Sequence, residues 1–379
     1  MGAKALLSNW ASRSNLAWLR KFLSPRTPEL LRIWQAVGQR WCVETLKISG
    51  KELEVGGWVL VPPERRARFD FTWNGEPFAQ IKFPVARPDV GSVFHYLAGA
   101  SESGFVCRAP WNQCEELVTI RCRDRKTGKP FFPNDCPYYY FYPRANEILP
   151  SPAQRRRVHG NVLEDNFRVV GSTVCMRLRA ALQTTTGKDL ADFPSILDWG
   201  CGCGRVTRYL AALAPGTVTG VDVDKDNVQW CREQLPLAEF HDIPLLPPTS
   251  LLPASFDLLI GVSVFTHLPE WPQFQWLEEL HRLAKPGAIL LLTFHGDATI
   301  CMMNLDPQQL VLRKQNGILG APYAIQDPNL PGKDSYRNTF HTTAYIRRHW
   351  SKHFQILKIF PGFVGDQDLV VLRKNDSRN

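Results

Sequence analysis

Three closely spaced glycines follow an acid in the middle of the chain. Asp198 ends the apolar segment 195–198, and Gly200, Gly202 and Gly204 follow it at alternate positions. Glycine permits a positive φ angle and lets a ligand approach the backbone closely, and a helix that starts there would direct unpaired N–H groups at that ligand. The spacing Asp-x-Gly-x-Gly-x-Gly therefore predicts a ligand-binding loop between a strand and a helix.

A second acid marks the end of the next apolar segment. Asp222 follows segment 218–221 and lies eighteen residues after Gly204. A carboxylate at a strand tip can accept hydrogen bonds from both hydroxyls of a ribose, and charge-assisted bonds of this kind contribute about 1.5–3 kcal/mol each. A dinucleotide fingerprint would need a third glycine at position 205, where Arg205 stands. The residues therefore favour a neutral or cationic ribonucleoside without a pyrophosphate.

The elements that must position these residues alternate between helices and buried strands. Such alternation predicts a parallel sheet with helices on both faces. The last two strands, 355–359 and 368–373, are joined by too few residues for a parallel crossover, so they must be antiparallel. The other predicted elements are strands 195–198, 218–221, 256–260 and 288–293 and helices 161–182, 205–213, 227–235, 272–283 and 343–352.

Five ordered blocks add a family resemblance to this pattern. They are Leu197–Gly204, Gly220–Asp222, Ser255–Asp257, Ser263–Leu268 and Glu279–Gly287. In this order they resemble the class I S-adenosylmethionine-dependent methyltransferases of bacterial type, and the resemblance covers residues 155–375. It implies an α/β, Rossmann-like fold whose seven-stranded sheet has an antiparallel last strand. It also implies S-adenosyl-L-methionine as the cofactor.

The resemblance assigns the cofactor contacts residue by residue. The three glycines would surround the methionine part, Asp222 would hold the ribose, and Asp198 would orient the amino group directly or through water. Asp242 lies where the family places the residue that contacts the edge of the adenine, although the residues around Asp242 differ from the family's common motif. The implied cofactor-binding residues are Asp198, Gly200, Gly202, Gly204, Asp222, Asp242 and Ser263.

Two segments supply candidate catalytic residues. His267 lies at the tip of the strand 256–260 and could be the base that an oxygen nucleophile needs; alternatively, it caps the next helix or packs beneath the cofactor. Tyr336 and His341 are predicted to line the acceptor pocket, beside the long loop 297–338, which is typical of a lid or binding loop. The full C-terminal candidate set is His295, Tyr336, Arg337, His341, Gln367 and Asp368.

The first 143 residues form two further regions in this interpretation. Residues 1–40 carry seven basic groups against one acid and read as a basic amphipathic segment that Pro25 and Pro28 break into two helices. This segment could contact a membrane surface or a protein partner, or pack on its own domain. Residues 41–143 are rich in short strands and predict a small β-sandwich, with a hairpin turn at Asn74-Gly75. Residues 144–379 would be the methyltransferase domain.

The composition and the absence of certain motifs exclude several classes of protein and substrate. The chain is 44% hydrophobic and 21% charged, which excludes wholesale disorder, and no run of 18 apolar residues occurs. Its start lacks the apolar block of a secretory signal, so we expect a cytoplasmic protein with free thiols and no metal site. Gly261–Val264 stands where enzymes that methylate nucleobase amines carry Asp/Asn-Pro-Pro-Tyr/Phe. This argues against nucleic-acid substrates.

The sequence thus predicts a methyltransferase that acts on a hydroxyl of a glycan or small molecule. Two alternatives stay open. An RNA-modifying enzyme would use the basic N-terminus and Arg155–Arg157, and its binding would depend strongly on salt. A methyltransferase-like binding or scaffold protein would use the N-terminal regions instead of catalysis.

Overall fold

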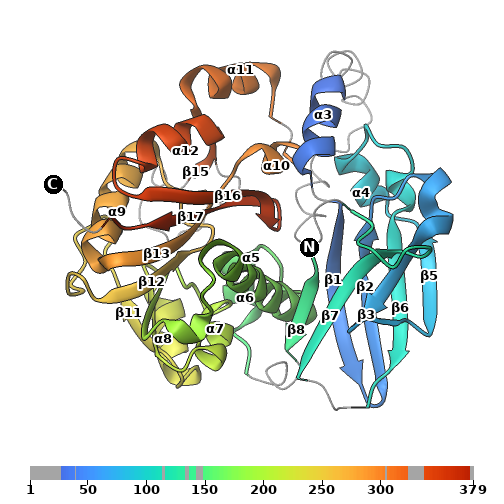
Figure 1. The fold of residues 1–379 in the computed structure, drawn as a ribbon, viewed down its shortest axis with the longest axis horizontal. Coiled ribbons are helices and arrows are strands. Elements are labelled where there is room, and N and C mark those ends of the chain that lie inside the picture. The colour runs from blue at the N-terminus through green and yellow to red at the C-terminus, as the bar shows by residue number, and fades with distance from the viewer. Residues whose placement is uncertain are drawn as a thin grey trace. The chain divides into compact units, whose positions relative to one another are not determined.

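The chain forms two compact units, Met1–Met176 and Arg177–Asn379, shown as a ribbon in Figure 1. The computed structural model describes residues 27–38, 40–112, 116–132, 136–141, 148–303, 305–322 and 337–375. The two units divide within helix α6 (Glu164–Thr186). The predicted domain boundary after residue 143 lies outside the described residues, so the predicted domain limits stay a prediction. In the described ranges, no helix is long and apolar enough to cross a membrane.

Unit 1 is built from two four-stranded antiparallel sheets, as the predicted β-sandwich requires. Side chains from both sheets form one apolar core, in which Val55 and Cys107 of the first sheet belong to the same cluster as Phe71 and Ile120 of the second. The first sheet has the order β1 (Trp41–Ser49), β2 (Glu52–Val59), β6 (Gly104–Pro110) and β5 (Gln80–Val85). The second has the order β4 (Glu76–Pro77), β3 (Phe69–Trp73), β7 (Leu117–Asp124) and β8 (Tyr138–Phe141).

The predicted hairpin turn at Asn74-Gly75 is confirmed. Trp73 of β3 pairs with Glu76 of β4, and Asn74 and Gly75 adopt φ angles of 46° and 92°. Two consecutive positive φ angles define the type I′ turn that matches the twist of the flanking strands. Asn and Gly are the residues that accept this conformation at least cost.

Helix α3 (Thr27–Val37) is the described part of the basic N-terminal segment. Its Trp34 is buried, and the guanidinium of Arg40 lies 4.2 Å from the Trp34 ring centroid. These contacts lie within the segment itself, so its role at a membrane, at a partner or on its own domain stays a prediction. The first predicted helix lies outside the described residues. Unit 1 also contains α4 (Pro88–Val93) and α5 (Pro152–His159).

Unit 2 contains the predicted seven-stranded sheet. Its first five strands are parallel, and β17 pairs antiparallel with both β13 and β16. Strand β9 lies at the centre, between β10 and β12, where the strand order changes direction; ligands bind at the carboxyl ends of strands at such a point. The order is β11 (Glu239–Asp242), β10 (Thr217–Asp222), β9 (Ser195–Trp199), β12 (Phe256–Gly261), β13 (Ala284–Phe294), β17 (Gln367–Arg373) and β16 (Gln355–Val364).

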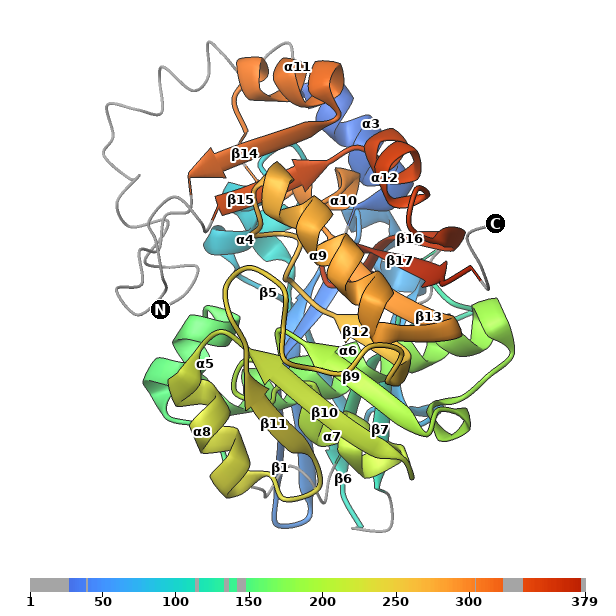
Figure 2. The same cartoon turned by 90° about the vertical axis from the view of Figure 1, so that its left-hand side faces the viewer.

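The helices of unit 2 agree with the predicted alternation. They are α7 (Thr207–Leu213), α8 (Lys225–Gln234), α9 (Glu270–Leu283) and α12 (Thr343–Trp350). Figure 2 allows α8, α9 and the parallel strands to be followed together. Residues 285–287 lie within β13, where the pairing with β12 shifts register and Gly287 has a φ of 72°.

The prediction of a long loop over residues 297–338 is wrong. Helices α10 (Asp297–Ile300) and α11 (Pro307–Asn316) occupy its first half, and β14 (Ile318–Pro322) pairs antiparallel with β15 (Arg337–His341). Figure 2 shows α11, β14 and β15 side by side. Asp306 caps α11 in a capping box with Gln309, and Gly317 ends the helix with a φ of 79°. These residues are ordinary helix-start and helix-stop signals that the Pro and Asn content obscured.

Candidate functional site

The glycine loop between β9 and α7 has the backbone that its sequence predicts. Gly200, Gly202 and Gly204 adopt φ angles of 77°, 53° and 70°, which side chains rarely tolerate. Packing adds a second restriction, because a Cβ on Gly200 would lie 2.3 Å from Val264 Cγ2, and one on Gly204 would lie 2.3 Å from Leu235 Cδ1. The loop therefore requires glycine for its own conformation as well as for the approach of a ligand.

Asp222 joins this loop to the end of β10. Its Oδ2 accepts a hydrogen bond from the Gly202 N–H at 2.7 Å, and its Oδ1 accepts one from the Asp224 N–H at 2.9 Å. Burial raises the pKa of Asp222, while these backbone N–H groups act in the opposite direction. Each carboxylate oxygen has a second acceptor position. The side chain can therefore accept hydrogen bonds from a ribose while it holds the loop.

Asp198 lies beside Asp222 on the neighbouring strand. It pairs in register with Gly220 of β10, and its Oδ2 accepts a hydrogen bond from Thr207 Oγ1 at 2.5 Å. Burial, together with the charge of Asp222, raises the pKa of Asp198 to about 6, while the hydrogen bond from Thr207 acts in the opposite direction. A bound cation would lower both pKa values. The pair therefore fits a ligand that joins a ribose to a positive charge, as S-adenosylmethionine does.

Asp242 and Ser263 lie at the ends of β11 and β12. Asp242 is the last residue of β11, is paired in register with Asp222 and is exposed. Its carboxylate forms an ion pair with Arg232 at 3.1 Å, which lowers the pKa of Asp242. Ser263 has a φ of 62°, which is rare for a residue other than glycine. Its N–H donates to Thr293 Oγ1 at 2.7 Å, and its Oγ accepts from Gln367 Nε2 at 2.8 Å. Nothing in the sequence singled out Thr293.

His267 follows Ser263 in the segment after β12. Its Nδ1 lies 3.3 Å from the carbonyl oxygen of Arg337, and its own carbonyl accepts the Arg337 N–H at 2.9 Å. Since a carbonyl only accepts hydrogen bonds, we assign the proton to Nδ1, which leaves a lone pair on Nε2. Burial lowers the pKa of His267 to about 4. The imidazole is therefore neutral at physiological pH, with Nε2 able to accept a proton.

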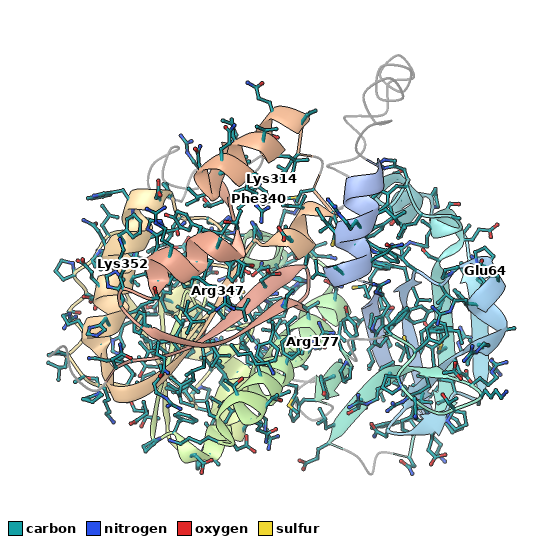
Figure 3. The ribbon with its side chains drawn as sticks, turned by 45° about the horizontal axis from the view of Figure 1, so that its top comes forward. Glu64, Arg177, Lys314, Phe340, Arg347 and Lys352 are labelled. Atoms are coloured by element: carbon teal, nitrogen blue, oxygen red, sulfur yellow. The ribbon has the colours of Figure 1, made fainter. Side chains whose placement is uncertain are left out.

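Two further histidines lie at the carboxyl end of β13 and on β15. His295 stacks on Phe340 with 5.3 Å between the ring centroids, and its ring lies 6.3 Å from that of His267. Figure 3 labels Phe340 on β15. His341 is fully buried, and its Nε2 donates to Gln273 Oε1 at 2.9 Å, as Gln273 Nε2 donates to the Leu268 carbonyl at 2.8 Å. Burial lowers the pKa of both histidines to about 3.

A cavity of about 440 Å³ is lined in part by Arg337, whose main chain is hydrogen-bonded to His267. Strand β15 is held against the segment after β12, because the Thr339 N–H donates to the Thr266 carbonyl at 2.8 Å and Arg337 is bonded to His267 as described above. His341 was predicted to line the acceptor pocket, but its buried ring does not line this cavity; Tyr336 lies outside the described residues. The cavity is lined by Pro269, Glu270, Asn316, Ile318, Gly320, Arg337 and Thr339.

The chain is similar to methyltransferases in its central part. Residues 196–287 match a family model described as a methyltransferase domain. A fatty-acid O-methyltransferase of Mycolicibacterium smegmatis is 34% identical over 107 residues, which are 26% of this chain and 36% of that protein. A trans-aconitate 2-methyltransferase of Azoarcus sp. is 31% identical over 117 residues, which are 31% of this chain and 45% of that protein. The chain thus spans less than half the length of these relatives.

Solved structures also match the chain, and one of them illustrates the extent of the match. A magnesium protoporphyrin IX methyltransferase from Synechocystis, with bound SAH, is 20% identical and has a TM-score of 0.39. The match covers 59% of this chain and 94% of the other.

Proposed function

We propose that this chain, which belongs to the class I S-adenosylmethionine-dependent methyltransferases and has S-adenosylmethionine as its cofactor, transfers a methyl group to a hydroxyl of a small molecule or glycan. The observation that carries this proposal is the pair of carboxylates on either side of the glycine loop, the buried Asp198 and the half-buried Asp222. The pair combines an acceptor for a ribose with two carboxyl groups whose raised pKa values a cation would relieve.

The cofactor supplies an activated methyl group on a sulfonium centre. Asp222 would accept hydrogen bonds from the ribose hydroxyls, and Asp198 would hold the amino group of the methionine part. The glycine loop would let the backbone approach that part closely. Asp242 would lie near the adenine and Ser263 near the edge of the cofactor site. These residues bind and orient, so their loss should weaken cofactor affinity more than it slows chemistry.

His267 would accept the proton of the attacking hydroxyl at Nε2. The bound cofactor would supply the methyl group, and a hydroxyl oxygen that receives it would become strongly acidic. Even a histidine with a pKa of about 4 is basic enough to remove a proton from such an oxygen. Because this imidazole is neutral above that pH, it is ready to do so at neutral pH.

His341 would support this chemistry without touching the acceptor. Its ring is fully buried and bonded to Gln273, which in turn bonds to the Leu268 carbonyl next to His267. We therefore propose that His341 is a positioning residue for the segment that carries the base. We also propose that Tyr336 lines the acceptor pocket, as the sequence predicts.

Calorimetric titration of S-adenosylmethionine and S-adenosylhomocysteine into the full chain tests the proposal. We expect wild type to bind both, and Asp222→Ala to weaken the affinity at least tenfold, a loss of about 1.4 kcal/mol. Asp226→Ala, which removes an exposed acid from the first turn of α8, is the matched control and should change the affinity less than twofold. A hydroxyl-compound screen that measures release of S-adenosylhomocysteine then tests transfer.

Two results would contradict the proposal. If wild type binds neither molecule, the glycine loop does not serve this cofactor, and the binding or scaffold interpretation replaces catalysis. If Asp222→Ala binds as tightly as wild type, the carboxylate pair does not hold the ribose.

A further inference from the structure

The cavity at β15 contains two charged side chains of opposite sign. Arg337 of β15 and Glu270 at the start of α9 both line it, and its remaining lining is small or polar apart from Pro269 and Ile318. A volume of about 440 Å³ is within the range of small-molecule sites. None of the residues assigned to the cofactor lines it, so the cavity is a separate place for a ligand.

Arg337 extends across the hairpin that forms one wall of the cavity. A Cβ built on Gly320 of β14 would lie 3.6 Å from Arg337 Cδ and 4.0 Å from Arg337 Nη1. The guanidinium therefore lies over Gly320, where a larger side chain would restrict its position. A guanidinium has five N–H donors in a planar fork, and two of them match the oxygens of one carboxylate.

Glu270 supplies the opposite charge and is fixed by a second residue. Its Oε1 accepts a hydrogen bond from the Tyr345 hydroxyl at 2.6 Å. Burial, together with the charge of Glu270, raises the pKa of Tyr345 above its usual range, so the phenol stays a donor. A carboxylate in this position attracts ligand donors such as a hydroxyl or an amine. It also repels a second negative charge, so a carboxylate suits the cavity better than a dianionic phosphate does.

The N-terminal end of α9 adds to the preference for an anion. The helix begins at Glu270 and runs for 14 residues, with Pro269 as its N-cap, and both residues line the cavity. The first N–H groups of a helix and its dipole favour negative charge. This partial positive charge and Arg337 act together on a ligand carboxylate.

We propose that the cavity binds the methyl acceptor as a small carboxylic acid, whose carboxylate is held by Arg337, while Glu270 accepts from a hydroxyl or amine other than the one that is methylated. This inference rests on the proposed function, because the acceptor must reach His267. The connection is short: the main chain of Arg337 is bonded to His267 at both the carbonyl and the N–H. Figure 3 labels Phe340 on β15 and Lys314 on α11, two elements that contribute lining residues to the cavity.

Matched pairs of acids and esters test this proposal directly. The probes are 4-hydroxybenzoate, tyrosine and lactate, each paired with its methyl ester, and binding to the full chain is measured by calorimetry with and without S-adenosylhomocysteine. In at least one pair, we expect the acid to bind at least tenfold more tightly than its ester. Arg337→Gln should abolish this preference, and Arg337→Lys should retain part of it.

A second charged residue of unit 2 provides the control. Arg347→Gln removes an exposed arginine from α12, labelled in Figure 3, and should leave the acid preference unchanged. In wild type, 4-hydroxyphenyl phosphate should bind more weakly than 4-hydroxybenzoate, and Glu270→Gln should reduce this difference. Thermal unfolding of each variant verifies that the fold is intact.

The outcomes separate this proposal from the proposed function. It is overturned if no pair shows an acid preference, or if the preference survives in Arg337→Gln. If the chain binds S-adenosylmethionine but shows no acid preference, only the cavity proposal fails. If the acid preference depends on Arg337 but the cofactor does not bind, the methyltransferase proposal fails and the cavity remains a carboxylate site.

Discussion

The two ends of the candidate site are built in different ways. At the cofactor end, Asp198, the glycine loop and Asp222 lie within one short stretch of sequence, and backbone N–H groups hold the Asp222 carboxylate. At the acceptor end, the contacting residues are far apart: His267 meets Arg337 across 70 residues, and His341 meets Gln273 across 68. The first end is a local structure, whereas the second exists only in the folded unit.

Burial also has opposite consequences at the two ends. It raises the pKa of Asp198 to about 6 and lowers the pKa of His267 to about 4, in each case favouring the neutral form. At the cofactor end, a cationic ligand restores the charge of the carboxylates. At the acceptor end, the imidazoles stay neutral and can accept protons. The difference suggests that binding and proton transfer are divided between the two ends.

The largest expected effect separates chemistry from binding. His267→Gln should lower kcat about 100-fold or more, because it removes the proton acceptor, while the affinity for S-adenosylmethionine changes less than twofold. Single-turnover measurements with an acceptor from the hydroxyl screen would test this. The exposed His241 provides the control variant His241→Gln. Normal turnover by His267→Gln would show that the acceptor end only positions its ligand.

The next effect concerns stability in acid. His295 and His341 have pKa values lowered to about 3 by burial, below the value of about 6.5 in an unfolded chain. Their contribution to stability is present above pH 6.5 and is lost as the pH falls below it, because the unfolded chain then binds more protons. At pH 5, the loss is about 2 kcal/mol for each histidine.

Urea unfolding at pH 5 and pH 7.5 measures this loss. His341→Gln should make the difference between the two pH values smaller than in wild type, whereas His241→Gln should leave it unchanged. Burial raises the pKa of Asp368 to about 7, which makes stability fall as pH rises over part of the same range. The test therefore compares wild type with the variant by the difference in unfolding free energy between pH 5 and pH 7.5. Equal pH dependence in His341→Gln and wild type would contradict the assignment of a neutral buried ring.

The smallest expected effect is at the cofactor end. The affinity for S-adenosylmethionine should rise severalfold between pH 5 and pH 7.5, because the cation must displace a proton from Asp198 below a pKa of about 6. Asp198→Asn should bind more weakly and lose most of this pH dependence. Asp242→Asn, which alters an exposed carboxylate paired with Arg232, should keep it. Calorimetry at four pH values would distinguish these variants, and a flat wild-type profile would contradict the cation-relief argument.

The parts of the fold that could be predicted are those with local causes. The sheet of unit 2 follows from apolar segments separated by helical ones, and the Asn74-Gly75 hairpin follows from residues that accept positive φ angles. The prediction of a long loop at 297–338 failed because α11, β14 and β15 are short. Their signals, such as the capping pair Asp306 and Gln309, are weak beside a high content of proline and asparagine.

The sequence alone predicted the glycine loop and the strand-end carboxylate of the proposed cofactor end. A glycine loop and a strand-end carboxylate depend on backbone conformation over a few residues, so Gly200, Gly202, Gly204 and Asp222 could be identified from their spacing. Only the tertiary structure decided the acceptor end. Burial sets the protonation of His267, and the packing of β15 against the segment after β12 brings Arg337 and Glu270 to one cavity. No local pattern encodes these properties, because they arise from contacts between segments that are distant in the chain.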